Sequence, residues 1–356
     1  DMAMDYKQEL DELLETTISE DGSDLHLSEG RHPTLRISGF LIPLVKKDIL
    51  TKESLLGLSN ALLTLEQKQI LTDKKEVDFA YVFKEKARFR GNAYYQQGKI
   101  SVALRLIPRH IRTLKELNLP ETLGLFVHKQ QGFFLVVGPT GQGKSTTLAT
   151  IVEMINADRL EHIITIEDPI EYVFDQKKSI IDQREVRYDT PTFQSALHSV
   201  FRQDVDVLMI GEMRDPNTIS TAVTAAETGH LVFSSLHTNT APQTVDRIID
   251  SFPAAQQDQI RMQLAGSLIG IFSQRLVPRI SGGLIPAYEL LLSNSAVSNL
   301  IREGRTHELG TVIETSSQEG MVDLNRCLVD LVRRGEITVE NAYLNSVNQK
   351  TLERML

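Results

Sequence analysis

The hydrophobic pattern of the chain changes near Pro108. Before it, segments such as VDFAYVF (77–83) and the run 87–108 alternate apolar and polar residues, as half-buried antiparallel strands do. An acidic helix at 6–17, the strand-like segments 25–28 and 34–44, and a helical middle precede them. After Pro108, apolar strands alternate with helices, which is typical of a parallel sheet covered on both faces. The pattern predicts an α+β domain followed by an α/β domain.

Chain length agrees with two domains, because 356 residues exceed the usual size of one hydrophobic core. We predict an N-terminal domain at 1–108, a linker at 109–118 and a second domain at 119–356 that ends in a helical region. RHIRTLKELNLP (109–120) is interpreted as a polar connector followed by a short helix.

The segment FFLVVGPTGQGKSTTLATI (133–151) places an apolar strand, a glycine-rich turn and a helix start in succession. It satisfies the P-loop pattern, in which backbone N–H groups and a helix N-terminus face the phosphates of a nucleotide. Lys144 is long enough to reach the β- and γ-phosphates, and Ser145 is a ligand for a Mg²⁺ that keeps mostly water and phosphate oxygens. We therefore expect ATP or ADP with Mg²⁺ on Gly138, Pro139, Thr140, Gly141, Gln142, Gly143, Lys144, Ser145 and Thr146.

Polar residues follow three later strands, and ligands of open α/β sheets bind at the carboxyl ends of strands. Glu212 follows the apolar strand VLMI (207–210). We predict that it is the catalytic base, because hydrolysis of a γ-phosphate needs a carboxylate that orients or deprotonates water. Gly211 stands where many P-loop ATPases carry a Mg²⁺-binding aspartate, so Ser145, the phosphates and water would hold the metal, and acidic groups would act on it without binding it directly.

Two further groups of candidates lie beside strands of the same domain. Glu167, Asp168 and Glu171 come at or after the end of one strand, where we expect accessory acidic groups, and a turn at Pro169 is the structural alternative for such a cluster. His230 precedes the strand LVFSSL (231–236) and His237 follows it. Each histidine fits either a sensor of the γ-phosphate or a buried, hydrogen-bonded structural role.

Composition narrows the function classes. With 41% hydrophobic and 24% charged residues the chain is ordinary globular protein, and the net charge of −9 argues against a broadly basic nucleic-acid binder. The single cysteine, Cys327, excludes an intrachain disulfide and a cysteine-only zinc cluster, and we predict that it is a buried residue of a helix.

No apolar run reaches the roughly 20 residues that span a bilayer, and the N-terminus has no signal-peptide character. We expect a cytoplasmic protein whose contact with the inner membrane is peripheral.

Four ordered motifs carry a family resemblance. They are GPTGQGKST (138–146), ITIEDPIEY (164–172), VLMIGEMRD (207–215) and TGHLVFSSLHTNTAPQTVDRIIDSFP (228–253). They resemble the Walker A loop, Asp box, Walker B motif and His box of the secretion and type IV pilus motor ATPases, most closely the pilus retraction ATPases. The resemblance extends over almost the whole chain, including EGMVDLNRCLVDLVRRGEIT (319–338).

The resemblance implies an α/β protein with a PAS-like N-terminal domain and a RecA-like ATPase domain, assembled as a hexameric ring. It assigns nucleotide and Mg²⁺ contacts to Lys144 and Ser145, catalysis to Glu212, and accessory roles to the acidic cluster named above. His230 and His237 become candidates for relaying the nucleotide state between subunits.

Several arginines are further candidates. Arg88, Arg90 and Arg105 resemble arginines that in such motors approach the nucleotide when the two domains close. Charged residues alternating along an exposed strand face would look the same, so both interpretations stand. Arg202, Arg214 and Arg275 of the second domain are candidates for offsetting phosphate charge.

Three positions depart from the family pattern. Gln142 stands where the family usually has serine, Val205 interrupts an Asp-Pro-Asp segment, and Ser298 replaces the arginine expected in AVSNLIR (296–302). The last motif is tied to retraction output, so the coupling of hydrolysis to pilus disassembly is less secure than hydrolysis itself.

The function expected from the resemblance is ATP hydrolysis that powers retraction of type IV pili, with twitching motility as its result. Partners would be other copies of the chain in a hexamer, a platform protein of the inner membrane and, indirectly, pilin. Extension and secretion ATPases usually carry a longer N-terminal region and a four-cysteine zinc module, which disfavours them here. The alternatives are such an extension or secretion ATPase, a nucleotide-gated scaffold with little turnover, and a DNA motor, which the charge disfavours.

Overall fold

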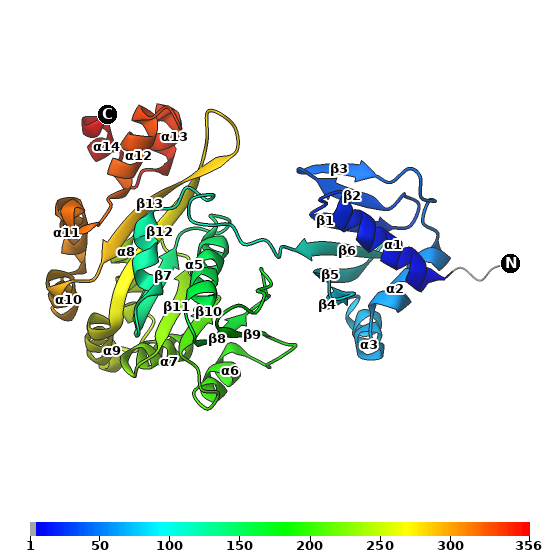
Figure 1. Ribbon diagram of the computed structural model, residues 1–356, viewed down its shortest axis with the longest axis horizontal. Helices are drawn as coiled ribbons and strands as arrows, with labels where there is room; N and C mark the ends of the chain where they lie inside the picture. Colours follow the sequence, from blue (N-terminus) through cyan, green and yellow to red (C-terminus); the bar gives the residue numbers. More distant parts are fainter. Residues whose placement is uncertain (1–4) are drawn as a thin grey trace. The chain divides into compact units, whose positions relative to one another are not determined.

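The computed structural model describes residues 5–356 and divides into two compact units, one ending at Arg109 and the other beginning at His110 (Figure 1). Residues 110–118, predicted as a linker, belong to the second unit, because Leu114 and Leu117 pack in one of its hydrophobic clusters. The prediction of a short helix in this segment is wrong, since residues 114–118 form turns. Apolar contacts with the second unit decide where these residues belong.

The first unit is a six-stranded antiparallel sheet with helices packed on it (Figure 1). The strand order is β3-β2-β1-β6-β5-β4. Its helices are α1 (Tyr6–Ser19), α2 (Lys52–Leu62) and α3 (Leu65–Lys74). Its strands are β1 (Asp24–Ser28), β2 (Thr34–Ile37), β3 (Phe40–Pro43), β4 (Glu76–Phe83), β5 (Ala87–Gln96) and β6 (Lys99–Ile107).

Alternation of side chains along β5 and β6 produces the two faces of this sheet. Phe89 and Leu104 are buried in a cluster with leucines of α1 and α2. Their neighbours Arg88, Arg90 and Arg105 therefore project from the opposite face. Arg90 and Arg105 are directly paired across the strands. The three arginines thus share one face, and their approach to a nucleotide stays a prediction.

The second unit contains a seven-stranded sheet of order β13-β12-β7-β11-β10-β8-β9. All neighbouring strands are parallel except β12 and β13, which form an antiparallel hairpin that the sequence pattern did not predict. The strands are β7 (Gly132–Val137), β8 (His162–Glu167), β9 (Ile180–Glu185), β10 (Val207–Ile210), β11 (Leu231–Leu236), β12 (Leu268–Pro278) and β13 (Leu284–Leu292).

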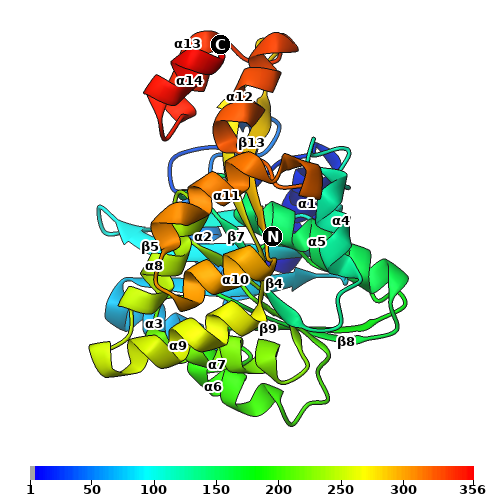
Figure 2. The same cartoon turned by 90° about the vertical axis from the view of Figure 1, so that its left-hand side faces the viewer.

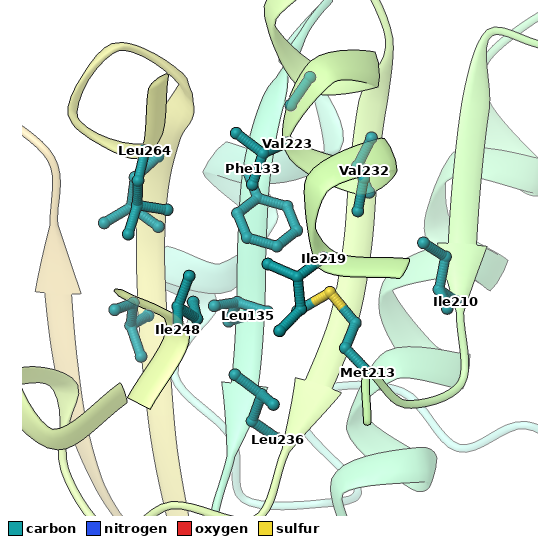
Figure 3. Packing of buried hydrophobic residues seen from close by; sticks show 14 of the residues in the cluster. Phe133, Leu135, Ile210, Met213, Ile219, Val223, Val232, Leu236, Ile248 and Leu264 are labelled. Atoms are coloured by element: carbon teal, nitrogen blue, oxygen red, sulfur yellow. The ribbon is translucent and has the colours of Figure 1, made fainter. Parts of the chain in front are cut away.

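Helices cover both faces of this sheet, because its central strands are apolar on both sides. Phe133 and Leu135 of β7 pack with Ile219 and Val223 of α7 in one cluster, as Figure 3 shows, while Phe134 packs in the cluster on the other face. The helices are η1 (Glu121–Leu123), α4 (Gly124–Val127), α5 (Lys144–Asp158), α6 (Phe193–Val200), α7 (Pro216–Glu227), α8 (Ala241–Asp250), α9 (Ala254–Ser267), α10 (Ser295–Arg302), η2 (Thr306–Glu308) and α11 (Leu309–Thr315).

The chain ends in a small helical group beside the β12–β13 hairpin (Figure 2). It consists of η3 (Ser317–Glu319), α12 (Leu324–Arg333), α13 (Val339–Asn345) and α14 (Gln349–Met355). Cys327 is buried in α12 with Val277 of β12 and Ile285 of β13. Burial raises the pKa of its thiol to about 11, so it remains a neutral, apolar contact at physiological pH. The prediction of a buried helical cysteine is confirmed.

Candidate functional site

The P-loop joins β7 to α5 at the carboxyl edge of the parallel sheet. Gly138, Gly141 and Gly143 have φ angles of +151°, +78° and +80°, a region that other residues rarely adopt. Gly143 is the N-cap of α5, and no side chain makes a hydrogen bond there. The first N–H groups of α5 are therefore free of side-chain caps, as phosphate binding at a helix N-terminus requires.

Lys144 lies buried across the loop and already makes polar contacts. Its Nζ donates to the carbonyls of Gly138 at 2.9 Å and Pro139 at 2.8 Å, and lies 3.3 Å from Nδ1 of His237. Burial lowers the pKa of the ammonium, and the Glu212 carboxylate acts in the opposite direction. The amine is thus held at the mouth of the loop next to a negative group.

His237 connects Lys144 to Glu212. Because the ammonium donates to Nδ1, the proton of a neutral imidazole resides on Nε2, which lies 3.2 Å from Oε2 of Glu212. The other carboxylate oxygen forms an ion pair with Arg214. These contacts arise because β7, β11 and β10 are adjacent and parallel, so that the residues after their ends meet. Lys144, His237 and Glu212 therefore form one hydrogen-bonded chain.

Glu167 lies at the end of the next strand, beside the backbone of Gly211. Its Oε2 accepts hydrogen bonds from Oγ1 of Thr165 at 2.7 Å and Nε2 of Gln183 at 3.2 Å, and the carboxylate also receives the backbone N–H of Glu171. Burial nevertheless raises its pKa to about 7. The group is thus poised between its acid and its carboxylate at neutral pH.

The other predicted residues of this edge differ in environment. Asp168 faces Arg187, with 3.3 Å between the charged groups. The Thr146 hydroxyl is 2.8 Å from that of Tyr172. Ser145 is exposed in the first turn of α5. Its hydroxyl is therefore accessible to a ligand, as a metal-binding serine must be.

Within the second unit, His230 lies apart from Lys144, His237 and Glu212, although the sequence makes it a candidate sensor of the γ-phosphate. His230 precedes β11 and His237 follows it, so that the strand separates them by about 20 Å. The ring of His230 instead contacts Phe201, in the turn that also carries Arg202. His230 and Arg202 therefore lie at the amino edge of the sheet. A role of His230 in relaying the nucleotide state between subunits stays a prediction.

Three residues of this edge escaped the sequence prediction. Gln183 holds Glu167, Tyr172 holds Thr146, and Gln274 of β12 contacts the P-loop. Tyr172 is the last residue of the motif ITIEDPIEY, but nothing in the sequence indicates that it contacts the loop, and each of the three reaches the site only through a sheet or loop neighbour. Beside the P-loop is a small pocket of about 70 Å³, lined by Arg112, Leu117, Leu119, Gly143, Thr146, Thr147, Gln274, Leu276 and Pro286.

Comparison with known proteins identifies the family. The family of type II/IV secretion system proteins matches residues 6–341. The chain belongs to this family. The pilus retraction ATPase PilT of Pseudomonas aeruginosa is 40% identical over 334 residues, which cover 94% of this chain and 97% of the relative. The pilus ATPase PilU of the same organism is 38% identical, over 98% of this chain and 91% of the relative.

A solved structure agrees with this membership. The crystal structure of the pilus retraction motor PilT with bound ADP matches with a TM-score of 0.90 and 43% identity, over 97% of this chain and 98% of that one. The predicted α/β class, with an N-terminal domain followed by a RecA-like ATPase domain, is confirmed. Within residues 5–356 no helix is both long and apolar enough to cross a membrane.

Proposed function

We propose that this chain is an ATPase that powers retraction of type IV pili. The observation that carries the proposal is the chain of contacts from Lys144 through His237 to Glu212 at the mouth of a P-loop. Similarity to PilT over nearly the full length of both proteins supports the specific cellular role.

Each member of this group has a defined task in hydrolysis. The uncapped N–H groups of α5 and the Lys144 ammonium bind the phosphates and offset their charge. The Glu212 carboxylate accepts a hydrogen bond from the attacking water, which displaces ADP at phosphorus, and the water's proton leaves to the carboxylate or to the phosphate. His237 and Arg214 each contact one oxygen of the Glu212 carboxylate and so fix its orientation.

The residues of the loop also fit Mg²⁺. Ser145 is exposed next to the phosphate-binding N–H groups and supplies the hydroxyl that P-loop proteins use for this ion. When bound, Mg²⁺ would offset the negative charge of the phosphates, with the Ser145 hydroxyl as the protein group that would hold it. The pocket beside Gly143 is lined by leucines and a proline, which suits the flat apolar faces of a nucleotide base.

The proposed working assembly is a homo-hexamer at a platform protein of the inner membrane, with pilin as the indirect target and no role for nucleic acid. Membership of the family of type II/IV secretion system proteins and the similarity to a pilus retraction motor support action within a pilus machine. The first-unit arginines Arg88, Arg90 and Arg105 are proposed to approach the nucleotide during the cycle, which their shared face permits.

The test is Mg²⁺-dependent ATP hydrolysis over a series of protein concentrations, with particle mass measured by light scattering. We expect turnover in a six-subunit particle, and loss of at least about 100-fold in Lys144→Ala and in Glu212→Gln, because each removes a charge that acts on the transition state. Glu212→Gln should still bind ADP. Activity in a monomer, or undiminished activity of Glu212→Gln, would refute the assignment.

A genetic test separates retraction from the alternatives. Deletion of the gene should leave cells with more surface pili and no twitching if the motor retracts them. Loss of pili would instead assign the chain to extension, and loss of protein export would assign it to secretion. A nucleotide-gated scaffold would bind ADP but show no turnover that depends on Glu212.

A further inference from the structure

Gln274 is a buried amide that contacts the P-loop from a neighbouring strand. It lies on β12, only 2% exposed, and uses both ends of its side chain. Its Nε2 donates to the carbonyl of Gln142 at 2.6 Å, and its Oε1 accepts from the Thr147 hydroxyl at 2.6 Å. One amide therefore joins the last part of the loop to the first turn of α5.

Two glycines of the loop pack directly against the same residue. A Cβ at Gly138 would lie 2.4 Å from the backbone oxygen of Gln274, and one at Gly143 would lie 2.7 Å from its Nε2. Distances below 3.0 Å are closer than real Cβ contacts. The path of the loop is therefore set by Gln274 as well as by the backbone freedom of glycine.

Gln142 returns the contact from the loop side. Its Oε1 accepts the backbone N–H of Leu276 at 2.7 Å. β7 ends at Val137, opposite Ser273, so the Leu276 N–H lies beyond the last residue of its parallel neighbour. The Gln142 side chain replaces the missing strand partner, and the two glutamines form a reciprocal pair of contacts between loop and sheet.

The opposite side of the same short segment holds the loop that follows His237. Ser273 donates from Oγ to the Asn239 carbonyl at 2.7 Å, and Arg275 lies 3.4 Å from Oδ1 of Asn239. Residues 273–276 thus contact both the loop before Lys144 and the loop after His237. Side chains alternate along a strand, so Ser273 and Arg275 project toward the loop after His237 while Gln274 projects toward the P-loop. This one segment therefore fixes the distance between the two loops.

We propose that Gln274 is a positioning residue that holds the P-loop in its phosphate-binding conformation through the Gln142 carbonyl and Thr147. It touches no reacting atom in this assignment and acts through the backbone of the loop. The inference rests on the proposed nucleotide chemistry and adds the residue that organises it. A loop held in advance loses less conformational freedom when a nucleotide binds, which favours affinity.

The test uses Gln274→Glu in the full chain, with dissociation constants for ADP measured by calorimetry. The change keeps the shape and the acceptor for Thr147 but replaces the donor to Gln142 by a carboxylate oxygen. At pH 8 we expect the dissociation constant for ADP to rise about tenfold or more. The buried carbonyl of Gln142 loses its hydrogen-bond donor and faces a negatively charged carboxylate oxygen instead. Its ratio to wild type should fall toward one at pH 5.5, where a protonated glutamate donates again.

Asn325→Asp is the matched control. Asn325 is also a buried amide, which donates to the Asn348 carbonyl at 3.0 Å and accepts from Ser346 at 2.6 Å, in the C-terminal helical group. The Asn325→Asp variant should have a lower free energy of unfolding than wild type but the same affinity for ADP. Thr147→Val, which removes only the hydroxyl that donates to Gln274, should weaken ADP binding in the same direction and decides the question if Gln274→Glu does not fold.

The outcomes are distinguishable. Unchanged ADP affinity in Gln274→Glu, or in Thr147→Val where that variant decides, overturns the positioning role. So does an equal loss in Asn325→Asp, or a loss in Gln274→Glu that is the same at pH 5.5 and pH 8. If wild type neither binds ADP nor hydrolyses ATP, the proposed function fails instead.

Discussion

Glu289 shows how one buried charge is tolerated next to the site. It lies on β13, 7% exposed, and its Oε1 accepts the backbone N–H of Ala241, the first residue of α8, at 2.8 Å. Burial raises its pKa to about 7, although the Ala241 N–H and the charge of Arg275 favour the carboxylate. The group therefore exchanges its proton near neutral pH.

This shift predicts a pH-dependent stability. A carboxyl group whose pKa is raised on folding favours the folded state below its unfolded pKa, near 4.5, and this contribution is lost as pH rises to about 7. Glu289→Gln keeps the acceptor for Ala241 without the charge. Its free energy of unfolding should lie within about 1 kcal/mol of wild type at pH 5 and exceed it by up to about 3 kcal/mol at pH 8. Urea unfolding at both pH values measures this, and parallel pH profiles would contradict it.

At the scale of the element, the β7–loop–α5 unit depends on two different properties of glycine. Gly141 needs only its left-handed backbone, since no atom lies within 4 Å of a Cβ placed there. Gly138 combines a positive φ with the close backbone oxygen of Gln274. The same substitution therefore has different physical consequences at the two positions.

We expect Gly138→Ala to weaken ADP binding far more than Gly141→Ala. The alanine at 141 adds backbone strain of about 1 kcal/mol, whereas the alanine at 138 must also displace β12 or the loop. Titration calorimetry of both variants with ADP, beside their melting temperatures, gives the comparison. Equal affinities for ADP in the two variants would show that packing against β12 does not shape the loop.

At the scale of the whole molecule, each unit has its own hydrophobic cores. Leu10, Leu58 and Phe89 belong to a cluster within the first unit, and Phe133 and Leu148 belong to clusters within the second. The P-loop, its contacts to β12 and the Lys144–His237–Glu212 chain lie entirely within residues 110–356.

Residues 110–356 expressed alone should therefore fold and bind ADP. Turnover should fall at least about tenfold, because the proposed charge-offsetting arginines Arg88, Arg90 and Arg105 are absent. Circular dichroism, calorimetry with ADP and an ATPase assay check the three expectations. Full turnover without the first unit would exclude those arginines from the chemistry.

The sequence by itself determined what depends on neighbours along the chain. The alternating strands of the first unit, the apolar strands of the second, the P-loop and the burial of Cys327 follow from periodicity, glycine placement and helix pattern. Glu212 and His237 could also be selected, because polar residues at the carboxyl ends of parallel strands share one edge.

Only the tertiary structure decided which of these groups meet. The order of the strands brings Lys144, His237 and Glu212 into one chain of contacts and leaves His230 at the opposite edge. The hairpin β12–β13 brings Gln274 to the loop from more than a hundred residues away along the chain. Such contacts depend on strand order and register, which arise from packing of the whole sheet and leave no signal in the local sequence.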